Sequence, residues 1–218
     1  MALEFSNGVR TMDFSSSLNK KVAGIFLAAG ASVRMGKTKQ LLPAGHETVL
    51  ERVLNEALKS DLDKVVLVLG HQAEEIRSTL GKILRHPKLK IIENRHYRQG
   101  MSTSIITGLI EVEDTYDHVM VILGDMPHID SSVINQLLHR YLDSRFPMGA
   151  VKAGKKRAHP VIFSRELYDE LHNLKGDVGG RSLFRKHGSR VCLVEPGKPY
   201  DDRDLDTPED YADFLKGL

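Results

Sequence analysis

A loop rich in small and positively charged residues follows the first apolar run of the chain. The residues suited to chemistry there are Leu27, Ala28, Ala29, Gly30, Arg34, Lys37 and Lys39. Small residues let a backbone approach a ligand closely, and successive N–H groups hold phosphate oxygens. This composition favours an anion-binding loop, with a charged surface turn as the alternative. The P-loop motif is not matched, because the five residues between Gly30 and Gly36 are one more than it has.

Carboxylates follow two other segments of the chain. Asp125 comes just after the apolar residues 119–123, and Asp204 and Asp206 flank Leu205. Alternate residues of an extended chain point to one side, so the latter two carboxylates can share a site. Carboxylate oxygens suit Mg²⁺, which keeps water and phosphate oxygens as further ligands. Asp125 is therefore a candidate metal ligand or the cap of a turn, while Asp204 fits better as a solvated residue.

Short apolar runs alternate with helical patterns from residue 21 onward, and these elements must position the candidate residues. Apolar periodicity predicts strands at residues 22–28, 65–69, 89–92 and 119–123, with helices near 49–58, 71–80, 105–110 and 134–141. Strand–helix alternation with short connections predicts right-handed βαβ units. The expected fold class is a three-layer α/β/α, Rossmann-like domain with a mostly parallel sheet. Ligands of such sheets bind beyond the carboxyl ends of the strands, where the loop and Asp125 fall.

The last third of the chain breaks this rhythm. We expect strands at residues 148–153 and 161–163 around a basic turn, residues 155–157, which we interpret as a solvated hairpin tip. Helices near 166–174 and 180–186 and a strand at 191–194 precede a final helix, which Thr207 caps with Pro208 at its first position. Residues 21–218 are predicted to form one domain, and residues 1–20 a flexible leader.

Composition excludes several classes of protein. The 218 residues are 41% hydrophobic and carry a net charge of +2, which gives no general argument for a nucleic-acid or membrane partner. No segment approaches the ~20 apolar residues of a membrane span. The single cysteine, Cys192, cannot form an intrachain disulfide, so a reducing cytoplasm is the simplest setting.

Ordered motifs along about residues 21–218 resemble the MobA-like nucleotidyltransferases. Within that family the similarity is highest to the branch that includes the molybdenum cofactor cytidylyltransferases. The motifs are Leu27-Ala28-Ala29-Gly30, Arg34-Met35-Gly36, Lys39, Leu41-Leu42-Pro43, Gly124-Asp125-Met126-Pro127, His159-Pro160, Gly176-Asp177, Gly179, Arg181 and residues 204–210. The resemblance implies a fold like that of the nucleotide-diphospho-sugar (GT-A-like) transferases.

The resemblance also implies a reaction: Mg²⁺-dependent transfer of CMP from CTP to the phosphate of a molybdopterin-type acceptor, with release of pyrophosphate. Arg34 would hold the β- and γ-phosphates, Lys39 the α-phosphate and leaving group, and Asp125 with Asp206 the metal. Guanylyl-type relatives tend to carry paired glycines where this chain has Ala28-Ala29, which favours CTP. A transient molybdenum-enzyme partner is also implied.

The remaining candidate residues are assigned to contacts with the nucleotide or with the acceptor. Nucleotide-side candidates are Leu27, Ala28, Ala29, Gly30, Gly100, Ser102 and Ser104, and acceptor-side candidates are His159, Asp177 and Arg181. Each has a structural alternative: a serine-capped helix start, a packed histidine, a helix-capping aspartate or a surface ion pair. Four functional alternatives stay open: GTP as the nucleotide, another phosphorylated acceptor, a P-loop phosphotransferase, and a non-catalytic accessory protein.

Overall fold

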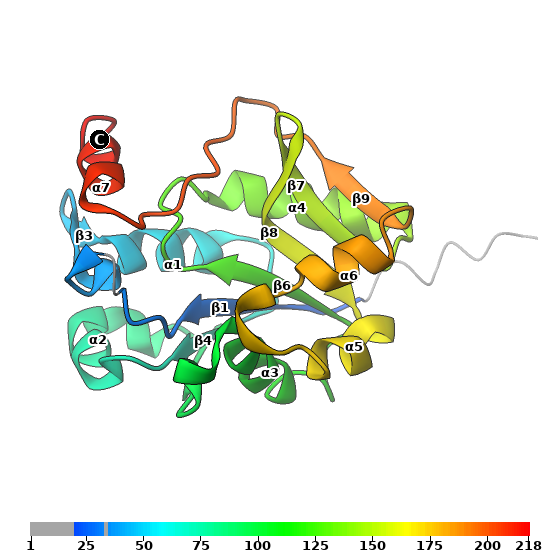
Figure 1. Ribbon diagram of the computed structural model, residues 1–218, viewed down its shortest axis with the longest axis horizontal. Helices are drawn as coiled ribbons and strands as arrows, with labels where there is room; N and C mark the ends of the chain where they lie inside the picture. Colours follow the sequence, from blue (N-terminus) through cyan, green and yellow to red (C-terminus); the bar gives the residue numbers. More distant parts are fainter. Residues whose placement is uncertain (1–19, 33–34) are drawn as a thin grey trace, which may run out of the picture.

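A computed structural model describes residues 20–32 and 35–218 (Figure 1). Its centre is a seven-stranded sheet in the order β5-β4-β1-β6-β8-β7-β9. The strands are β1 (Val22–Ala28), β4 (Lys64–Leu69), β5 (Leu89–Glu93), β6 (His118–Leu123), β7 (Met148–Ala153), β8 (Lys156–Ser164) and β9 (Val191–Val194). All pairings are parallel except those of β8, which runs antiparallel to both β6 and β7. The prediction of a mostly parallel sheet is confirmed.

Helices cover both faces of this sheet and complete the three layers (Figure 1). They are α1 (Val49–Lys59), α2 (Ala73–Leu80), α3 (Met101–Ile110), α4 (Ser131–Ser144), α5 (Tyr168–His172), α6 (Arg181–Lys186) and α7 (Pro208–Leu215). One core forms between the sheet and α1, α2 and α4, and the other between the sheet and α3, α5 and α6. The last helix, α7, packs separately, near the ribbon of β2 (Pro43–Ala44) and β3 (Glu47–Thr48).

The central strand shows why the sequence forms this sheet. Every residue of β1 is buried, and its side chains alternate between the two cores: Phe26 enters one and Ile25 the other. Burying a side chain of this size contributes roughly 1.5–3 kcal/mol. Gly108 lets α3 lie close against the strand, because a Cβ there would meet Ile25 at 2.4 Å. The start of α3 is thereby held at the carboxyl edge of the sheet.

The expected elements of residues 21–141 are all present, as are those of the C-terminal third. One expectation is wrong: β8 begins at Lys156, so Lys156 and Arg157 belong to a strand and only Lys155 lies in the turn. The antiparallel pairing with β7 extends the strand to these residues. Residues 1–19 of the expected leader lie outside the described residues, and the single-domain assignment stays a prediction. Within residues 20–32 and 35–218, no helix is long and apolar enough to cross a bilayer.

Candidate functional site

The carboxyl ends of three neighbouring strands meet at one edge of the sheet. The last residues of β1 pair with the last residues of β4 and β6, so the loops that follow them converge. A distant segment joins them, because the Leu205 N–H donates to the Asp125 carbonyl at 2.9 Å. The glycine-rich loop, Asp125 and the C-terminal acidic residues are thus brought together from positions far apart in the sequence.

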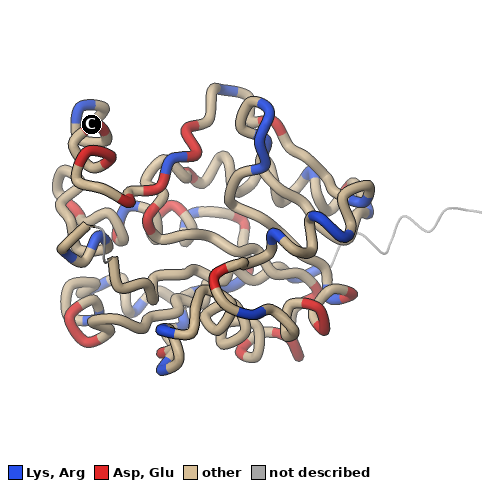
Figure 2. Tube along the Cα trace, viewed as in Figure 1, with Lys and Arg blue, Asp and Glu red and all other residues tan. Residues whose placement is uncertain are grey.

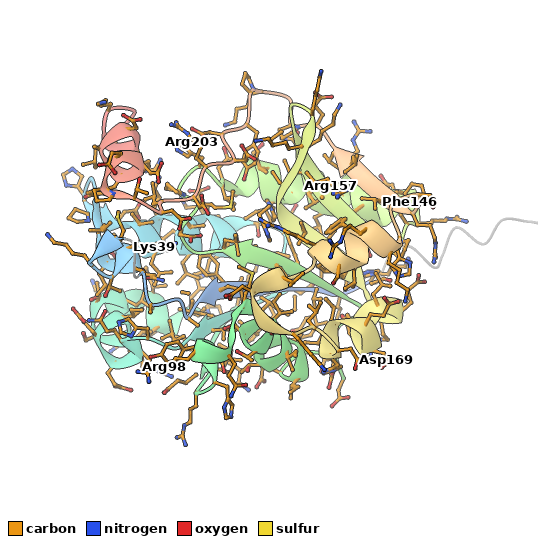
Figure 3. All side chains as sticks on the ribbon, in the orientation of Figure 1. Lys39, Arg98, Phe146, Arg157, Asp169 and Arg203 are labelled. Carbon is orange, nitrogen blue, oxygen red and sulfur yellow. The ribbon has the colours of Figure 1, made fainter. Side chains whose placement is uncertain are left out.

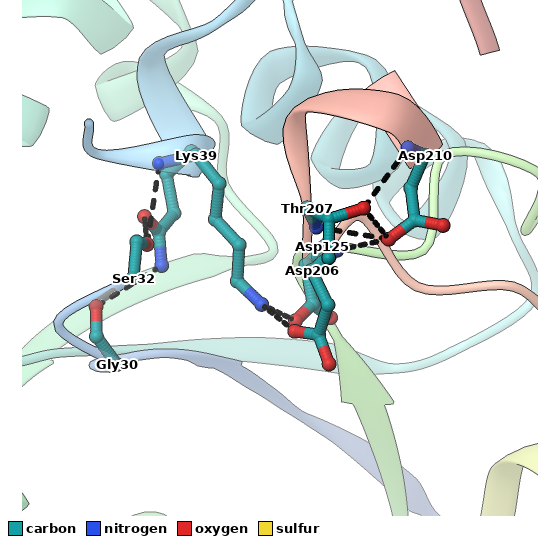
Figure 4. A network of polar contacts seen from close by, with 8 residues as sticks. Gly30, Ser32, Lys39, Asp125, Asp206, Thr207 and Asp210 are labelled. Carbon is teal, nitrogen blue, oxygen red and sulfur yellow. Dashed lines mark hydrogen bonds and ion pairs between the residues drawn. The ribbon is translucent and has the colours of Figure 1, made fainter. Parts of the chain in front are cut away.

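A cluster of three carboxylates forms at this edge. Asp125, Asp204 and Asp206 each offer an oxygen, and these oxygens all lie within 4.8 Å of one another. Between two of them lies Lys39, whose Nζ contacts Asp125 Oδ2 and is 3.1 Å from Asp206 Oδ1 (Figure 4). Asp204 was expected to be only a solvated residue; it is exposed, but its carboxylate belongs to the cluster.

The charges of this cluster determine which ligand it suits. Burial lowers the pKa of Lys39, but Asp125 and then Asp206 outweigh that effect, so the pKa lies above its usual value. Burial, and then the charges of Asp206 and Asp125, raise the pKa of Asp204. Three hard oxygen donors this close together repel one another and fit a divalent cation such as Mg²⁺ or Mn²⁺. The cluster can therefore bind a divalent metal.

Local structure on both sides of Asp206 fixes its position. Leu205 is only 2% exposed and packs with Val49 and Phe214. Thr207 then caps α7: its Oγ1 accepts from the Asp210 N–H at 3.2 Å, and its own N–H donates to Asp210 Oδ2 at 2.8 Å (Figure 4). The expected Thr207 cap is confirmed. Asp206 is held between an apolar anchor and a capped helix start.

Two polar residues that the sequence did not indicate close the glycine-rich loop on itself. Gln40 is 3% exposed, and its Nε2 donates to the Gly30 carbonyl at 3.4 Å. Ser32 Oγ accepts from the Lys39 N–H at 3.2 Å and donates to Gln40 Oε1 at 3.3 Å. These bonds direct Lys39 toward the carboxylates. No local sequence pattern indicates that a glutamine such as Gln40 is buried. Arg34 lies outside the described residues.

The small residues of the loop border the site through their backbone. The side chains of Leu27, Ala28 and Ala29 are buried, with 9%, 2% and 5% exposure, whereas Gly30 is exposed. Beside the loop is a hollow of about 660 Å³ whose lining includes Ser32, Lys37, Thr38, His71 and Gln72. The His71 N–H donates to the Ala29 carbonyl at 3.1 Å and joins this turn to the loop. The sequence-based candidates did not include the turn after β4.

The two predicted serine contacts are buried. Ser102 and Ser104 are 1% and 4% exposed, and Ser104 Oγ accepts from Asn94 Nδ2 at 2.9 Å. Both residues belong to the first turn of α3 and expose almost no surface for a ligand to contact. Their assignment to the nucleotide stays a prediction that the burial disfavours.

Gly100 and Asp177 join α3 to the segment before α6. Gly100 has φ of +109°, and a Cβ there would meet the Gly176 carbonyl carbon at 2.4 Å. Asp177 Oδ1 accepts from the Met101 N–H at 2.9 Å and caps the start of α3. The helix-capping alternative for Asp177 is therefore the contact that the structure shows. Its role toward an acceptor stays a prediction.

His159 lies next to the acidic cluster, on β8. Its Nδ1–H donates to the Val121 carbonyl at 3.5 Å, and its own carbonyl accepts from the Tyr200 hydroxyl at 2.7 Å. Burial lowers the pKa of His159, and the charges of Asp125 and Arg181 act on the ring in opposite directions. Arg181 is exposed at the start of α6. The charges of Asp125 and Arg181 thus both reach His159, whereas the third acceptor-side candidate, Asp177, contacts the start of α3.

Comparison with known protein families and structures gives a consistent match. A model of the MobA-like NTP transferase domain matches residues 24–191. Nicotine blue oxidoreductase of Paenarthrobacter nicotinovorans is 28% identical, over 86% of this chain and 93% of that protein. The molybdenum cofactor cytidylyltransferase of Escherichia coli is 29% identical, over 86% of this chain and 92% of its own length. The names of these relatives describe different activities.

Solved structures share the whole architecture. A Mycobacterium sp. strain JC1 homologue of Rv0371c aligns with a TM-score of 0.78 and 28% identity, over 90% of this chain and 96% of its own. Rv0371c of Mycobacterium tuberculosis in complex with manganese aligns with a TM-score of 0.74 and 25% identity, over 90% and 98%. A Methanothermobacter nucleotidyl transferase, at 19% identity and a TM-score of 0.77, shares the fold over 92% of this chain and 100% of its own.

Proposed function

The chain belongs to the MobA-like NTP transferase family, and we propose that it transfers CMP from CTP to the phosphate of a molybdopterin-type acceptor. Pyrophosphate is the other product, and Mg²⁺ is the cofactor. The observation that carries the proposal is the position of Lys39, between Asp125 and Asp206 at the carboxyl edge of the sheet. A cation suited to phosphate oxygens lies there beside a carboxylate cluster suited to a divalent metal.

The proposed reaction needs charge compensation more than a protein nucleophile. An oxygen of the acceptor phosphate attacks the α-phosphorus of CTP, and the bond from that phosphorus to the β-phosphate oxygen breaks. Both substrates are anionic, so the largest obstacle is their mutual repulsion. The acceptor phosphate is ionised at neutral pH, so no general base is required. Positioning and electrostatics are sufficient for this class of transfer.

Each group near the edge has a part in this proposal. Asp125 and Asp206 would hold Mg²⁺, with Asp204 adjacent, and the bound ion would supply positive charge between the two substrates. Lys39 would move its ammonium from its ion pairs with Asp125 and Asp206 onto the α-phosphate and the leaving group. Arg34 is assigned the β- and γ-phosphates by resemblance. The backbone at residues 28–30 borders the nucleoside.

The nucleotide and acceptor are finer assignments than the family itself. The pair Ala28-Ala29 and the similarity to a molybdenum cofactor cytidylyltransferase support CTP and a molybdopterin-type acceptor. His159 and Arg181 are the proposed acceptor contacts, because the charges of Asp125 and Arg181 both act on the His159 ring. A cytoplasmic setting and a transient molybdenum-enzyme partner complete the proposal.

A matrix of nucleotides and acceptors tests the proposal directly. Purified protein with Mg²⁺ is mixed with CTP, GTP, ATP or UTP and with phosphorylated molybdopterin, and pyrophosphate is measured. We expect release with CTP and this acceptor, and none with the dephosphorylated acceptor. Pyrophosphate release with GTP alone would identify GTP instead of CTP as the nucleotide. Formation of a nucleoside diphosphate without pyrophosphate would indicate a phosphotransferase. No release with any pair would favour the non-catalytic accessory role.

A further inference from the structure

Arg157 is held on a platform beside the proposed acceptor site. Its Cζ lies 5.3 Å from the centre of the Phe184 ring, and that ring is 5.7 Å from the ring of Phe163. Phe184 is only 5% exposed, so the platform belongs to the core beneath α6. Figure 3 shows Arg157 on the hairpin of β7 and β8, above this helix. Arg157 is exposed, and its guanidinium lies over the Phe184 ring, where a cation–π contact orients it.

The same helix presents a second guanidinium. Arg181 is the first residue of α6, and the preceding Gly180 packs against Phe163, where a Cβ would lie 2.7 Å from the ring. This close approach fixes the start of the helix relative to β8. The charges of Arg181 and Asp125 both act on the ring of His159. Arg181 at the start of α6 and Asp125 after β6 therefore act on the same acceptor-side candidate.

Neither guanidinium is neutralised by a carboxylate of the described chain. Among residues 20–32 and 35–218, Arg157 has only its contact with Phe184, and Arg181 has no ion pair or hydrogen bond. Elsewhere on α6, Lys186 pairs with Glu170 at 3.0 Å. Figure 2 shows the positive charge of both the hairpin and α6 on this side of the molecule. Two unpaired arginines on one rigid surface suit a dianion, because a guanidinium binds phosphate oxygens in pairs.

We propose that Arg157 is a further acceptor-binding residue, which holds the phosphate monoester of the acceptor together with Arg181. The inference rests on the proposed function and names the group that fixes the acceptor phosphate on the α6 side. A dianion bound there lies against α6, which carries both Arg181 and Phe184. Its negative charge is compensated by the arginines, while Lys39 and the metal compensate the triphosphate. Repulsion between the two substrates is then reduced from both sides.

The chain contains a matched control for this assignment. Lys155 is exposed in the turn of the same hairpin and has no ion pair in the described part of the chain. Arg157→Gln and Lys155→Gln therefore each remove one positive charge from the same hairpin. Only Arg157→Gln removes a cation that is held over Phe184. Arg157→Lys keeps the charge but loses the planar fork, so we expect it to fall between Arg157→Gln and the unchanged protein.

The binding experiment uses phenyl phosphate, a simple phosphate monoester, titrated against each variant and followed by ³¹P NMR. We expect Arg157→Gln to raise its Kd by about tenfold, because charge-assisted hydrogen bonds are lost. Lys155→Gln should change the Kd by less than about twofold, as exposed charges contribute little. A Kd that responds to Lys39→Ala but not to Arg157→Gln places the probe on the nucleotide side and overturns the assignment. Absence of binding to the unchanged protein also overturns it.

Turnover separates this inference from the proposed function. With an active substrate pair, Arg157→Gln should raise the KM of the acceptor by about tenfold and leave the KM of the nucleotide within about twofold. Equal effects on both constants would contradict a role on the acceptor side. If the unchanged protein turns over no pair, the proposed function fails, and the phenyl phosphate titration still decides whether Arg157 binds a phosphate. Thermal unfolding of each variant confirms that the fold is retained.

Discussion

Acidification should destabilise this protein through one buried histidine, His118. Its Nδ1 lies 2.9 Å from the Tyr141 hydroxyl, which in turn donates to the Pro147 carbonyl at 3.4 Å. Its Nε2 is buried without a hydrogen-bond partner. Protonation would leave an N–H⁺ group without an acceptor, so the neutral ring is strongly preferred. Burial, and then the charge of Lys20, lower the pKa of His118 from 6.5 to about 4.

This shift sets the size and the sign of the effect. The unfolded chain takes up a proton on His118 below its usual pKa of 6.5, whereas the folded chain does so only near pH 4. Between those values the unfolded state binds more protons, so the free energy of unfolding falls as the pH falls. Each pH unit costs about 1.4 kcal/mol, and the whole window costs about 3 kcal/mol. Above pH 6.5 both states are neutral and the contribution is constant.

Urea unfolding between pH 7 and pH 5 measures this slope. Most carboxylates stay ionised across that range. Burial also lowers the pKa of His128 and His159, so a variant at His118 is needed to isolate its share. His118→Phe has no proton to gain and should give a curve flatter by about 1.4 kcal/mol per pH unit below pH 6. His139→Gln is the control, because that side chain is 60% exposed, and its curve should follow the unchanged protein. Parallel curves for His118→Phe and the unchanged protein would refute the reasoning.

Three further predictions concern the site. Leu205→Ala should lower the free energy of unfolding by about 2–5 kcal/mol, because it opens a cavity beside Asp206. Urea unfolding measures this loss, with Leu215→Ala as the control, because the Leu215 side chain is 42% exposed. Equal losses in the two variants would contradict the anchor role of Leu205. Asp125→Asn should abolish the rise in Tm that Mg²⁺ or Mn²⁺ produces while leaving the metal-free Tm nearly unchanged; a retained rise would remove it from the ligand set. Lys39→Ala should lower kcat by roughly 10²–10³-fold, since a cation aimed at developing charge contributes about 3–4 kcal/mol; a loss below about twofold would show that Lys39 only neutralises the carboxylates.

The sequence predicts the strands and helices well because their signals are local. An unbroken apolar run such as β1 or β4 indicates a strand buried on both faces, and the periodicity of α1 indicates its apolar side. Helix starts are local too, as the Thr207 cap shows. The prediction that Lys156 and Arg157 lie in a turn is wrong because their strand structure depends on a contact with another strand. Those residues are polar by composition, and only their pairing with β7 makes them a strand.

The contacts of the site depend on long-range placement, which local patterns do not carry. Asp177 caps α3 from 76 residues away along the chain. Gln40 is polar and indistinguishable in sequence from a surface residue, yet it is buried and holds the glycine-rich loop. Asp204 joins the cluster only because Leu205 is anchored to the Asp125 loop. Resemblance supplied the pairing of Asp125 with Asp206, which spacing alone left open.

The carboxylate cluster is therefore tied to the stability of the C-terminal segment. Asp125 follows β6, which is paired with β1 on one side and with β8 on the other, so its position is as stable as the sheet. Asp204 and Asp206 instead depend on one buried leucine, one backbone bond and the short helix α7. Short peripheral units open at a lower cost than a central sheet. Any weakening of α7 should consequently reduce divalent-metal affinity before it reduces the stability of the whole fold.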